Sequence, residues 1–143
     1  MFIGYARTST VDQNYSLEDQ LEKLEAADCD RIYSEQVSAV ESSRPEFEKA
    51  LEVLREGDVL VVTKLDRLAR SVLDLNKTMQ TIEAKGAGLK ILDLALDTTT
   101  ATGRMMMNVI GSVAQFEREL MLERQRIGIQ KAKDAGRYKG RKP

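Results

Sequence analysis

The sequence predicts an α/β domain with a largely parallel central sheet flanked by helices, followed by one long C-terminal helix. Three observations lead to this fold class. Strand-like runs alternate with segments of helical periodicity along residues 1–92. Residues 59–62, VLVV, are continuously apolar, as expected of a strand buried on both faces. No proline interrupts residues 101–135, which keep a helical pattern.

The first part of the chain gives two strand signals and one helix signal. Residues 2–7 show the two-residue alternation of a strand and include β-branched and aromatic side chains, which indicates a strand. Residues 8–12 have the composition of a turn. A serine followed by Leu, Glu and Asp favours a helix over residues 16–27. Residues 30–35 predict a second strand, and residues 36–44 a loop with three serines.

The elements before the long helix follow the same alternation. Pro45 suits the first turn of a helix, and Gly57 marks where that segment ends. After the apolar strand over residues 59–62, one helix is predicted over residues 66–85, ended by Gly86. Residues 89–92 predict a fourth strand.

Composition indicates a globular domain and restricts its chemistry. A length of 143 residues suits one domain with a real core. No apolar run reaches 18 residues and no signal-peptide pattern is present, so we expect a cytoplasmic, nucleoid-associated protein without a membrane partner. With no histidine and only Cys29, histidine-based triads, common zinc sites and internal disulfides are excluded, and we expect neither metal nor cofactor.

The net charge of −1 conceals a strongly basic end. From Arg124 onward there are eight Lys/Arg and one acidic residue, for a net charge of +7, whereas the preceding residues carry 14 basic and 22 acidic side chains, for −8. Such asymmetry favours a nucleic-acid contact at the basic end. A solvated tail without a partner is the alternative.

The long helix carries an apolar stripe. At 1.5 Å per residue it would extend about 50 Å, whereas a domain of this size has a radius of gyration of about 15 Å, so we expect it to project. Its apolar residues recur at spacings of three and four, which favours a helix-mediated oligomer over an ordinary core helix with an exposed end. The residues expected at this interface are Met106, Val109, Ile110, Val113, Phe116 and Leu120.

Two groups of residues follow predicted strands and have the chemistry of a reactive site. Arg7 and Ser9 have the same parity, so both side chains leave one face of an extended strand. Lys64, Arg67 and Arg70 follow the apolar strand, and the last two share a face if residues 66–85 form one helix. Arginines at a helix N-terminus oppose the helix dipole, which suggests anion ligands rather than stabilisers.

A serine hydroxyl among several arginines, with no metal, suits transfer of a phosphoryl group from a phosphodiester to an alcohol. Guanidinium groups bind phosphate oxygens in pairs and stabilise the charge of the transition state. Two other classes remain open: a DNA-binding or assembly module with vestigial catalytic residues, and a small-molecule phosphotransferase.

Four sequence blocks are more specific than the spacing of single residues. They are YARTST at residues 5–10 with Asp12 and Gln13, SRPEF at 43–47, KLDRLARS at 64–71 and GSVAQFERELMLER at 111–124. Together, and in this order, they resemble the serine recombinases of the resolvase/invertase family. Whether the outcome is resolution, inversion or integration is decided in this family by site arrangement and accessory proteins rather than by these blocks.

The resemblance implies a resolvase-like catalytic domain that acts on double-stranded DNA as a homodimer and, when active, a homotetramer. A serine attacks DNA, displaces a 3′ hydroxyl and keeps the 5′ phosphate as a phosphoserine ester, and rotation of half the tetramer exchanges the strands. The ester conserves bond energy, so no cofactor is implied. Accessory DNA-bending proteins are implied as further partners.

The resemblance also assigns roles to residues of the core. Ser9 matches the nucleophile, and Asp66 matches an acid that assists proton transfer or orients arginines. The positions that match phosphate-binding arginines are Arg7, Arg44, Arg67 and Arg70. The supporting positions near the DNA phosphate are Tyr5, Gln13, Gln20 and Lys64.

Further roles are implied for the long helix and the basic end. Arg118 matches a helix arginine near the active site, and Glu117 and Glu123 match interface positions that affect conversion of dimer to tetramer. The basic residues expected to contact DNA phosphates are Arg124, Lys139, Arg141 and Lys142. We therefore expect a catalytic core over residues 1–100, an oligomerisation helix over 101–136, and a basic hinge over 137–143 that leads towards a helix-turn-helix domain absent from this sequence.

Overall fold

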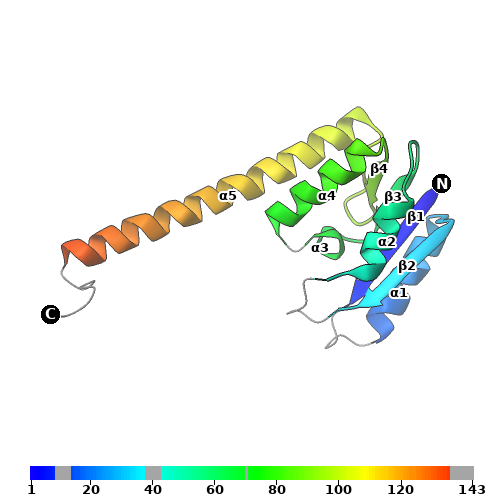
Figure 1. The fold of residues 1–143 in the computed structure, drawn as a ribbon, viewed down its shortest axis with the longest axis horizontal. Helices are drawn as coiled ribbons and strands as arrows, with labels where there is room; N and C mark the ends of the chain where they lie inside the picture. Colours follow the sequence, from blue (N-terminus) through cyan, green and yellow to red (C-terminus); the bar gives the residue numbers. More distant parts are fainter. Residues whose placement is uncertain (9–13, 38–42, 70, 136–143) are drawn as a thin grey trace. The chain divides into compact units, whose positions relative to one another are not determined.

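The computed structural model describes residues 1–8, 14–37, 43–69 and 71–135. The chain divides into two compact units, Met1–Asn108 and Val109–Pro143. Among the residues just given, the first unit contains a five-stranded sheet, four helices and the beginning of a fifth, and the second contains the rest of that fifth helix (Figure 1).

The sheet has the order β2-β1-β3-β4-β5 and is parallel apart from its last strand. Its strands are β1 (Phe2–Thr8), β2 (Arg31–Gln36), β3 (Val59–Val62), β4 (Gly88–Ile91) and β5 (Leu96–Asp97). β1 pairs along its length with β2, from Ile3 opposite Arg31 to Thr8 opposite Gln36, whereas its pairing with β3 ends at Gly4 opposite Val61. The largely parallel sheet predicted from the sequence is confirmed, and the short antiparallel β5 was not predicted.

The helices are α1 (Asn14–Ala26), α2 (Pro45–Val53), α3 (Leu65–Leu68), α4 (Val72–Ala84) and α5 (Ala101–Asp134). Pro45 occupies the first turn of α2, as predicted from its fixed backbone angle. Gly86, just beyond α4, adopts a positive φ of 70°, which ends the helix in a conformation that favours glycine. Among the described residues, no helix is long and apolar enough to cross a membrane.

The helices cover both faces of the sheet. Side chains of β1 alternate between these two faces, so they contact helices on each. Ala6 packs in a cluster with Leu24 of α1, and a side chain at Gly4 would come within 3.3 Å of Leu24, so this face lies against α1. Tyr5 points the other way, with its ring centroid 4.8 Å from that of Phe47 in α2. Odd-numbered residues of β1 therefore face the side of the sheet on which α2 and Arg44 lie.

One helix prediction was wrong. The segment 66–85 forms two helices, α3 and α4, because Ala69 is extended, with φ −141° and ψ 146°. Ser71 is the N-cap of α4, and its hydroxyl oxygen accepts a hydrogen bond from the Asp74 backbone N–H. A serine three residues before an acid is a helix-start signal, and here it overrides the helical periodicity on either side of it.

The long helix α5 confirms the predicted helical run at residues 101–135 to within one residue. Its first turns pack on β5: a side chain at Gly103 would lie 1.7 Å from the Asp97 carbonyl oxygen, so only glycine fits. Arg104 Nη1 donates to the Thr98 carbonyl at 3.2 Å. Glycine at residue 103 thus lets the helix start directly against the edge of the sheet.

Candidate active site

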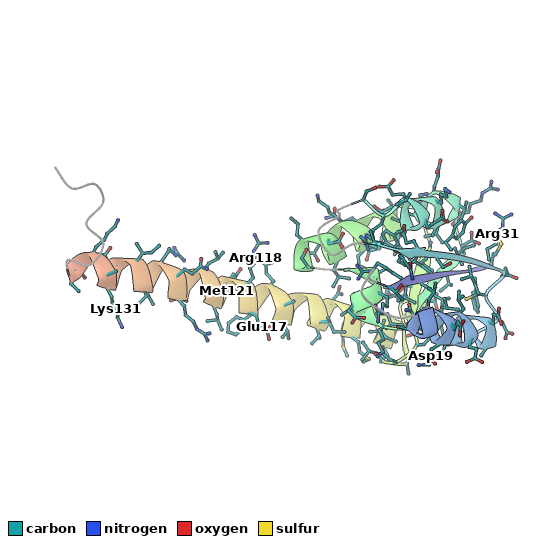
Figure 2. The ribbon with its side chains drawn as sticks, turned by 90° about the horizontal axis from the view of Figure 1, so that it is seen from below. Asp19, Arg31, Glu117, Arg118, Met121 and Lys131 are labelled. Carbon is teal, nitrogen blue, oxygen red and sulfur yellow. The ribbon has the colours of Figure 1, made fainter. Side chains whose placement is uncertain are left out.

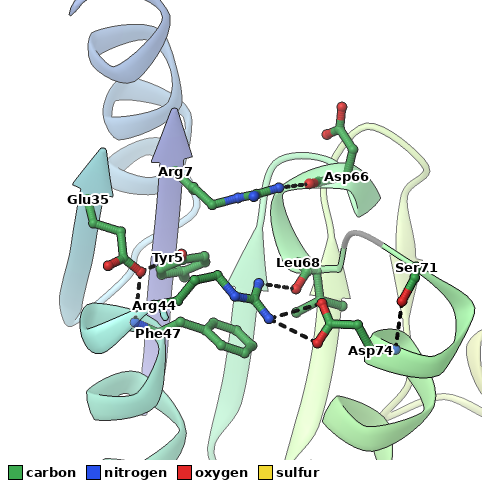
Figure 3. A network of polar contacts seen from close by, with 9 residues as sticks. All are labelled: Tyr5, Arg7, Glu35, Arg44, Phe47, Asp66, Leu68, Ser71 and Asp74. Carbon is green, nitrogen blue, oxygen red and sulfur yellow. Dashed lines mark hydrogen bonds and ion pairs between the residues drawn. The ribbon is translucent and has the colours of Figure 1, made fainter. Parts of the chain in front are cut away.

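Arg7 connects the end of β1 to the start of α3. Its Nη2 donates a hydrogen bond to the Asp66 backbone carbonyl, across 59 residues of sequence (Figure 3). β1 and β3 are parallel neighbours, so β1 and the segment that follows β3 meet at the same edge of the sheet. The structure thereby brings Arg7 beside the segment that contains Lys64, Asp66 and Arg67.

The short helix α3 presents charged groups at this edge. The Asp66 carboxylate is mostly exposed, and Arg67 Nε lies 3.7 Å from it. Lys64 is the N-cap residue of α3 and is exposed, while its carbonyl accepts a hydrogen bond from Arg67 N–H. Arg67, which the resemblance assigns to phosphate binding, is therefore close to a solvent-facing acid.

Arg44 is nearly buried and bound to protein groups. It precedes α2 as the N-cap residue and is 8% exposed. Nη1 donates to the Leu68 carbonyl at 2.8 Å, and Nη2 donates to both carboxylate oxygens of Asp74 at 3.1 and 3.0 Å. Its guanidinium carbon lies 4.2 Å from the centroid of the Phe47 ring, a cation–π contact.

Tyr5 is completely buried and holds a carboxylate that caps a helix. Its hydroxyl donates to Glu35 Oε2 at 2.6 Å, and the same carboxylate accepts the backbone N–H groups of Glu46 at 3.2 Å and Phe47 at 3.1 Å. Burial and the Glu35 carboxylate raise the pKa of Tyr5 well above its usual range. Tyr5 therefore supports the site indirectly, through its packing on Phe47 and its hydrogen bond to Glu35.

Gln20 of α1 is also buried and binds the backbone at the end of β1. Its Oε1 accepts from Arg7 N–H at 3.2 Å, and its Nε2 donates to the Arg7 carbonyl at 3.0 Å and to the Ser16 carbonyl at 3.4 Å. The side chain thus fixes the strand immediately before the position of Ser9 in the sequence.

Two buried hydroxyls lie at the carboxyl ends of the central strands. Thr8 ends β1 and Thr63 follows β3, and each is at most 3% exposed. Neither hydroxyl has a hydrogen-bond partner among the residues the structure describes. No group of three or more metal-binding side chains was found within that part of the chain.

Comparison with known proteins decides the family. The family model for the resolvase N-terminal domain matches residues 2–138. The chain belongs to this family. DNA-invertase hin of Salmonella typhimurium is 42% identical over 139 residues, which cover 97% of this chain and 72% of that protein. Serine recombinase gin of Escherichia phage Mu is 40% identical over 143 residues, covering the whole of this chain and 73% of that protein.

A solved structure agrees with this assignment. A resolvase family site-specific recombinase from Streptococcus pneumoniae has 26% sequence identity and a TM-score of 0.68, over 93% of this chain and 99% of that chain. The resolvase fold expected from the four sequence blocks is thereby confirmed, including the long helix that follows the sheet.

Several predicted site residues of this resolvase domain lie outside the described residues. They are Ser9, Gln13, Arg70, Lys139, Arg141 and Lys142. The prediction that Arg67 and Arg70 share one helical face was wrong, because α3 ends at Leu68 and Ala69 is extended.

Sequence reasoning missed Glu35 and Asp74, the two acids that organise the site's framework. Asp74 carried a signal, since it stands three residues after Ser71 in a helix-start pattern. Glu35 carried none, because its partners Tyr5, Glu46 and Phe47 are remote or backbone groups that only the tertiary fold brings together.

In the second unit α5 exposes most of its apolar residues. Val109, Val113 and Phe116 are 54%, 51% and 59% exposed, whereas Ile110 and Leu120 are half-buried. Figure 2 shows Glu117, Arg118, Met121 and Lys131 extending from this helix. The predicted interface residue Glu123 and the predicted DNA contact Arg124 are likewise exposed, as is Met106, which belongs to the first unit.

Proposed function

We propose that this resolvase-family chain is the catalytic domain of a serine recombinase that cuts, exchanges and rejoins double-stranded DNA. Its relatives carry the names DNA-invertase and serine recombinase. The observation that carries the proposal is the Arg7–Asp66 contact, which joins the strand leading to Ser9 with the arginine-bearing segment after β3.

The proposed reaction is an exchange of phosphodiester bonds. The Ser9 oxygen bonds to a backbone phosphorus, the bond from phosphorus to the 3′ oxygen breaks, and the departing oxygen takes up a proton as a 3′ hydroxyl. The serine proton passes to a base, for which the exposed Asp66 carboxylate is our candidate. Attack by a 3′ hydroxyl on the phosphoserine ester then reverses both bond changes and restores Ser9.

Positive charge is the main contribution of the protein to this step. Guanidinium groups placed before the reaction stabilise the charge that develops on the phosphate oxygens, and the loss of one such donor typically costs about 10² to 10³ in rate. Arg7 and Arg67 flank the Asp66 position in the structure and are our first candidates for this role. Arg70 is proposed on its match to the family's motif.

The assembly proposed is a dimer that becomes a tetramer through α5. An exposed row of Val109, Val113 and Phe116 on one helix supports it, because apolar rows on soluble proteins usually pack against a partner. Glu117 and Glu123 are proposed to lie at this interface. Action on DNA would place the protein at the nucleoid, with Arg118 and Arg124 near the DNA backbone.

Trapping of the covalent intermediate tests the proposal. The full-length protein is mixed with a duplex containing its crossover site, and denaturing gels then report a protein–DNA adduct joined through a 5′ phosphate. We expect the adduct with wild type and with the matched variant Ser34→Ala, and none with Ser9→Ala, although Ser9→Ala still binds the duplex. An adduct formed by Ser9→Ala, or none formed by wild type under any condition, would refute the proposal.

A further inference from the structure

The Arg44 guanidinium bridges two points of the chain that flank residue 70. Nη1 binds the carbonyl of Leu68, the last residue of α3, at 2.8 Å. Nη2 binds both carboxylate oxygens of Asp74, in the first turn of α4 (Figure 3). One side chain thus fixes the distance between the end of one helix and the start of the next.

Asp74 connects this bridge to the N-terminus of α4. Its backbone N–H donates to the Ser71 hydroxyl oxygen at 3.1 Å, and its side chain is 30% exposed. A carboxylate in the first turn of a helix interacts favourably with the helix dipole, which helps to hold Asp74 in place. The acid therefore links the helix cap to the Arg44 guanidinium.

Arg44 is in turn held on the β1 side of the site. It packs over the Phe47 ring, and that ring contacts Tyr5, two residues before Arg7. The side chain of Arg44 is only 9% exposed, so its geometry is set by packing rather than by solvent. A continuous set of contacts therefore runs from β1 through Phe47 and Arg44 to Asp74.

We propose that Asp74 is a positioning residue, and that through Arg44 it holds the end of α3 and the start of α4, between which Arg70 lies in the sequence, in place relative to β1, the strand that precedes Ser9 in the sequence. This inference rests on the proposed function. Arg44 then affects the reaction by holding the ends of α3 and α4 in place. Donors on both of its terminal nitrogens are engaged by Leu68 and Asp74.

The family resemblance offers a different role for Arg44, direct binding of the DNA phosphate. The two roles predict effects of opposite sign for Asp74→Asn. If Asp74 only restrains a phosphate-binding Arg44, loss of its charge releases the guanidinium and raises the cleavage rate or the affinity for DNA. If the pair instead holds the ends of α3 and α4 together, the same change loosens that connection and lowers the cleavage rate, while affinity stays the same.

The experiment compares binding and cleavage by the full-length protein on a duplex with its crossover site. The variants are Asp74→Asn, Arg44→Gln and the two combined, with Glu83→Gln as the control because Glu83 is an exposed acid on the same helix. Fluorescence anisotropy gives the Kd, and single-turnover trapping at saturating protein gives the rate of adduct formation.

We expect each single variant to slow adduct formation by about tenfold or more, since displacements near 1 Å can cost 10²-fold. Their Kd should stay within about twofold of wild type, and the double variant should be no slower than the slower single variant, because coupled residues are not additive. Glu83→Gln should match wild type in both measurements. An unchanged or faster rate for Asp74→Asn, or additive losses in the double variant, would overturn the inference.

Removal of one partner from a largely buried ion pair is strongly destabilising, so folding is tested separately. Each variant is melted by circular dichroism and assayed well below its transition. Asp74→Glu keeps the charge and should retain more of the cleavage rate than Asp74→Asn. Equal losses in the two, or failure of both to fold, would make the pair a requirement of folding alone and reject the positioning role. A wild type that forms no adduct would instead refute the proposed function.

Discussion

The side chain of Gln20 pairs with both backbone groups of Arg7, its Oε1 accepting from the N–H and its Nε2 donating to the carbonyl. The pairing of β1 with β3 ends at Gly4, three residues earlier. The amide of Gln20 therefore offers Arg7 the donor and acceptor that a neighbouring strand would offer, and it extends the order of the sheet towards Ser9.

Replacement of Gln20 by alanine should weaken both the fold and the reaction. Loss of the two hydrogen bonds to the Arg7 backbone should lower the free energy of unfolding by about 2 kcal/mol. Because the affected strand leads directly to Ser9, the rate of adduct formation should fall more than the affinity for DNA. Urea denaturation and single-turnover trapping measure the two effects.

Glu22→Ala is the matched control for this prediction, since Glu22 is an exposed residue on the same helix. It should change neither the stability nor the rate appreciably. A Gln20→Ala variant as stable as Glu22→Ala would show that the paired hydrogen bonds contribute nothing to β1.

Tyr5→Phe should destabilise the protein at neutral pH and alter its response to alkali. Loss of the hydrogen bond to the Glu35 carboxylate should cost about 2 kcal/mol. Because burial raises the pKa of Tyr5 above its ordinary value of about 10, the folded state keeps the hydroxyl protonated where the unfolded chain ionises. That contribution is complete below pH 10 and is lost as the pH rises further.

Urea denaturation at pH 7 and at pH 10.5 checks both parts of this prediction. Wild type should lose stability between these values by more than Tyr5→Phe does, because the variant lacks the group that ionises. Tyr33→Phe, in β2, retains Tyr5 and should follow wild type. Identical alkaline losses in wild type and Tyr5→Phe would assign the pH dependence to other groups.

Much of the framework could be predicted because local chemistry and tertiary structure agree there. Pro45 begins α2, and the apolar run at residues 59–62 forms β3 between β1 and β4. The position of Arg7 beside the α3 segment was not predicted, because it depends on β1 and β3 being parallel neighbours, which the sequence does not reveal.

The remaining features depend on contacts between segments far apart in the sequence. The helix over residues 66–85 was predicted as continuous because its periodicity persists across Ala69, whereas the Ser71 cap and the Arg44 bridge favour a break. Glu35 could not be found by any local pattern, since the helix it caps begins ten residues later in the chain and its phenol partner lies on another strand.

Cys29 should react slowly with alkylating reagents in the folded protein. Burial, with a further contribution from the Asp30 carboxylate, raises the pKa of the thiol to about 11. Since the thiolate is the nucleophile, native protein at pH 8 should have roughly 100-fold less reactive thiolate than the unfolded chain. Mass spectrometry after iodoacetamide treatment, with and without urea, measures the ratio.

The alkylation rate of native protein should also keep rising up to about pH 11. The stability that the protonated thiol contributes is complete below the unfolded pKa of 9.0 and is lost as the pH approaches 11. Equal native and unfolded rates at pH 8 would show that the thiol is neither buried nor perturbed.

Thr8→Val should stabilise the protein, which is unusual for a completely buried position. The Thr8 hydroxyl has no hydrogen-bond partner in the described part of the chain, and a buried unpaired hydroxyl costs about 1 kcal/mol or more. Valine keeps the branched shape and favours a strand. Thr98→Val is the control, because the Thr98 hydroxyl accepts a hydrogen bond from Leu89 N–H at 2.8 Å and its removal should destabilise. Opposite shifts in the urea midpoint are therefore expected, and a loss of stability in both variants would mean that the Thr8 hydroxyl has a partner in solution.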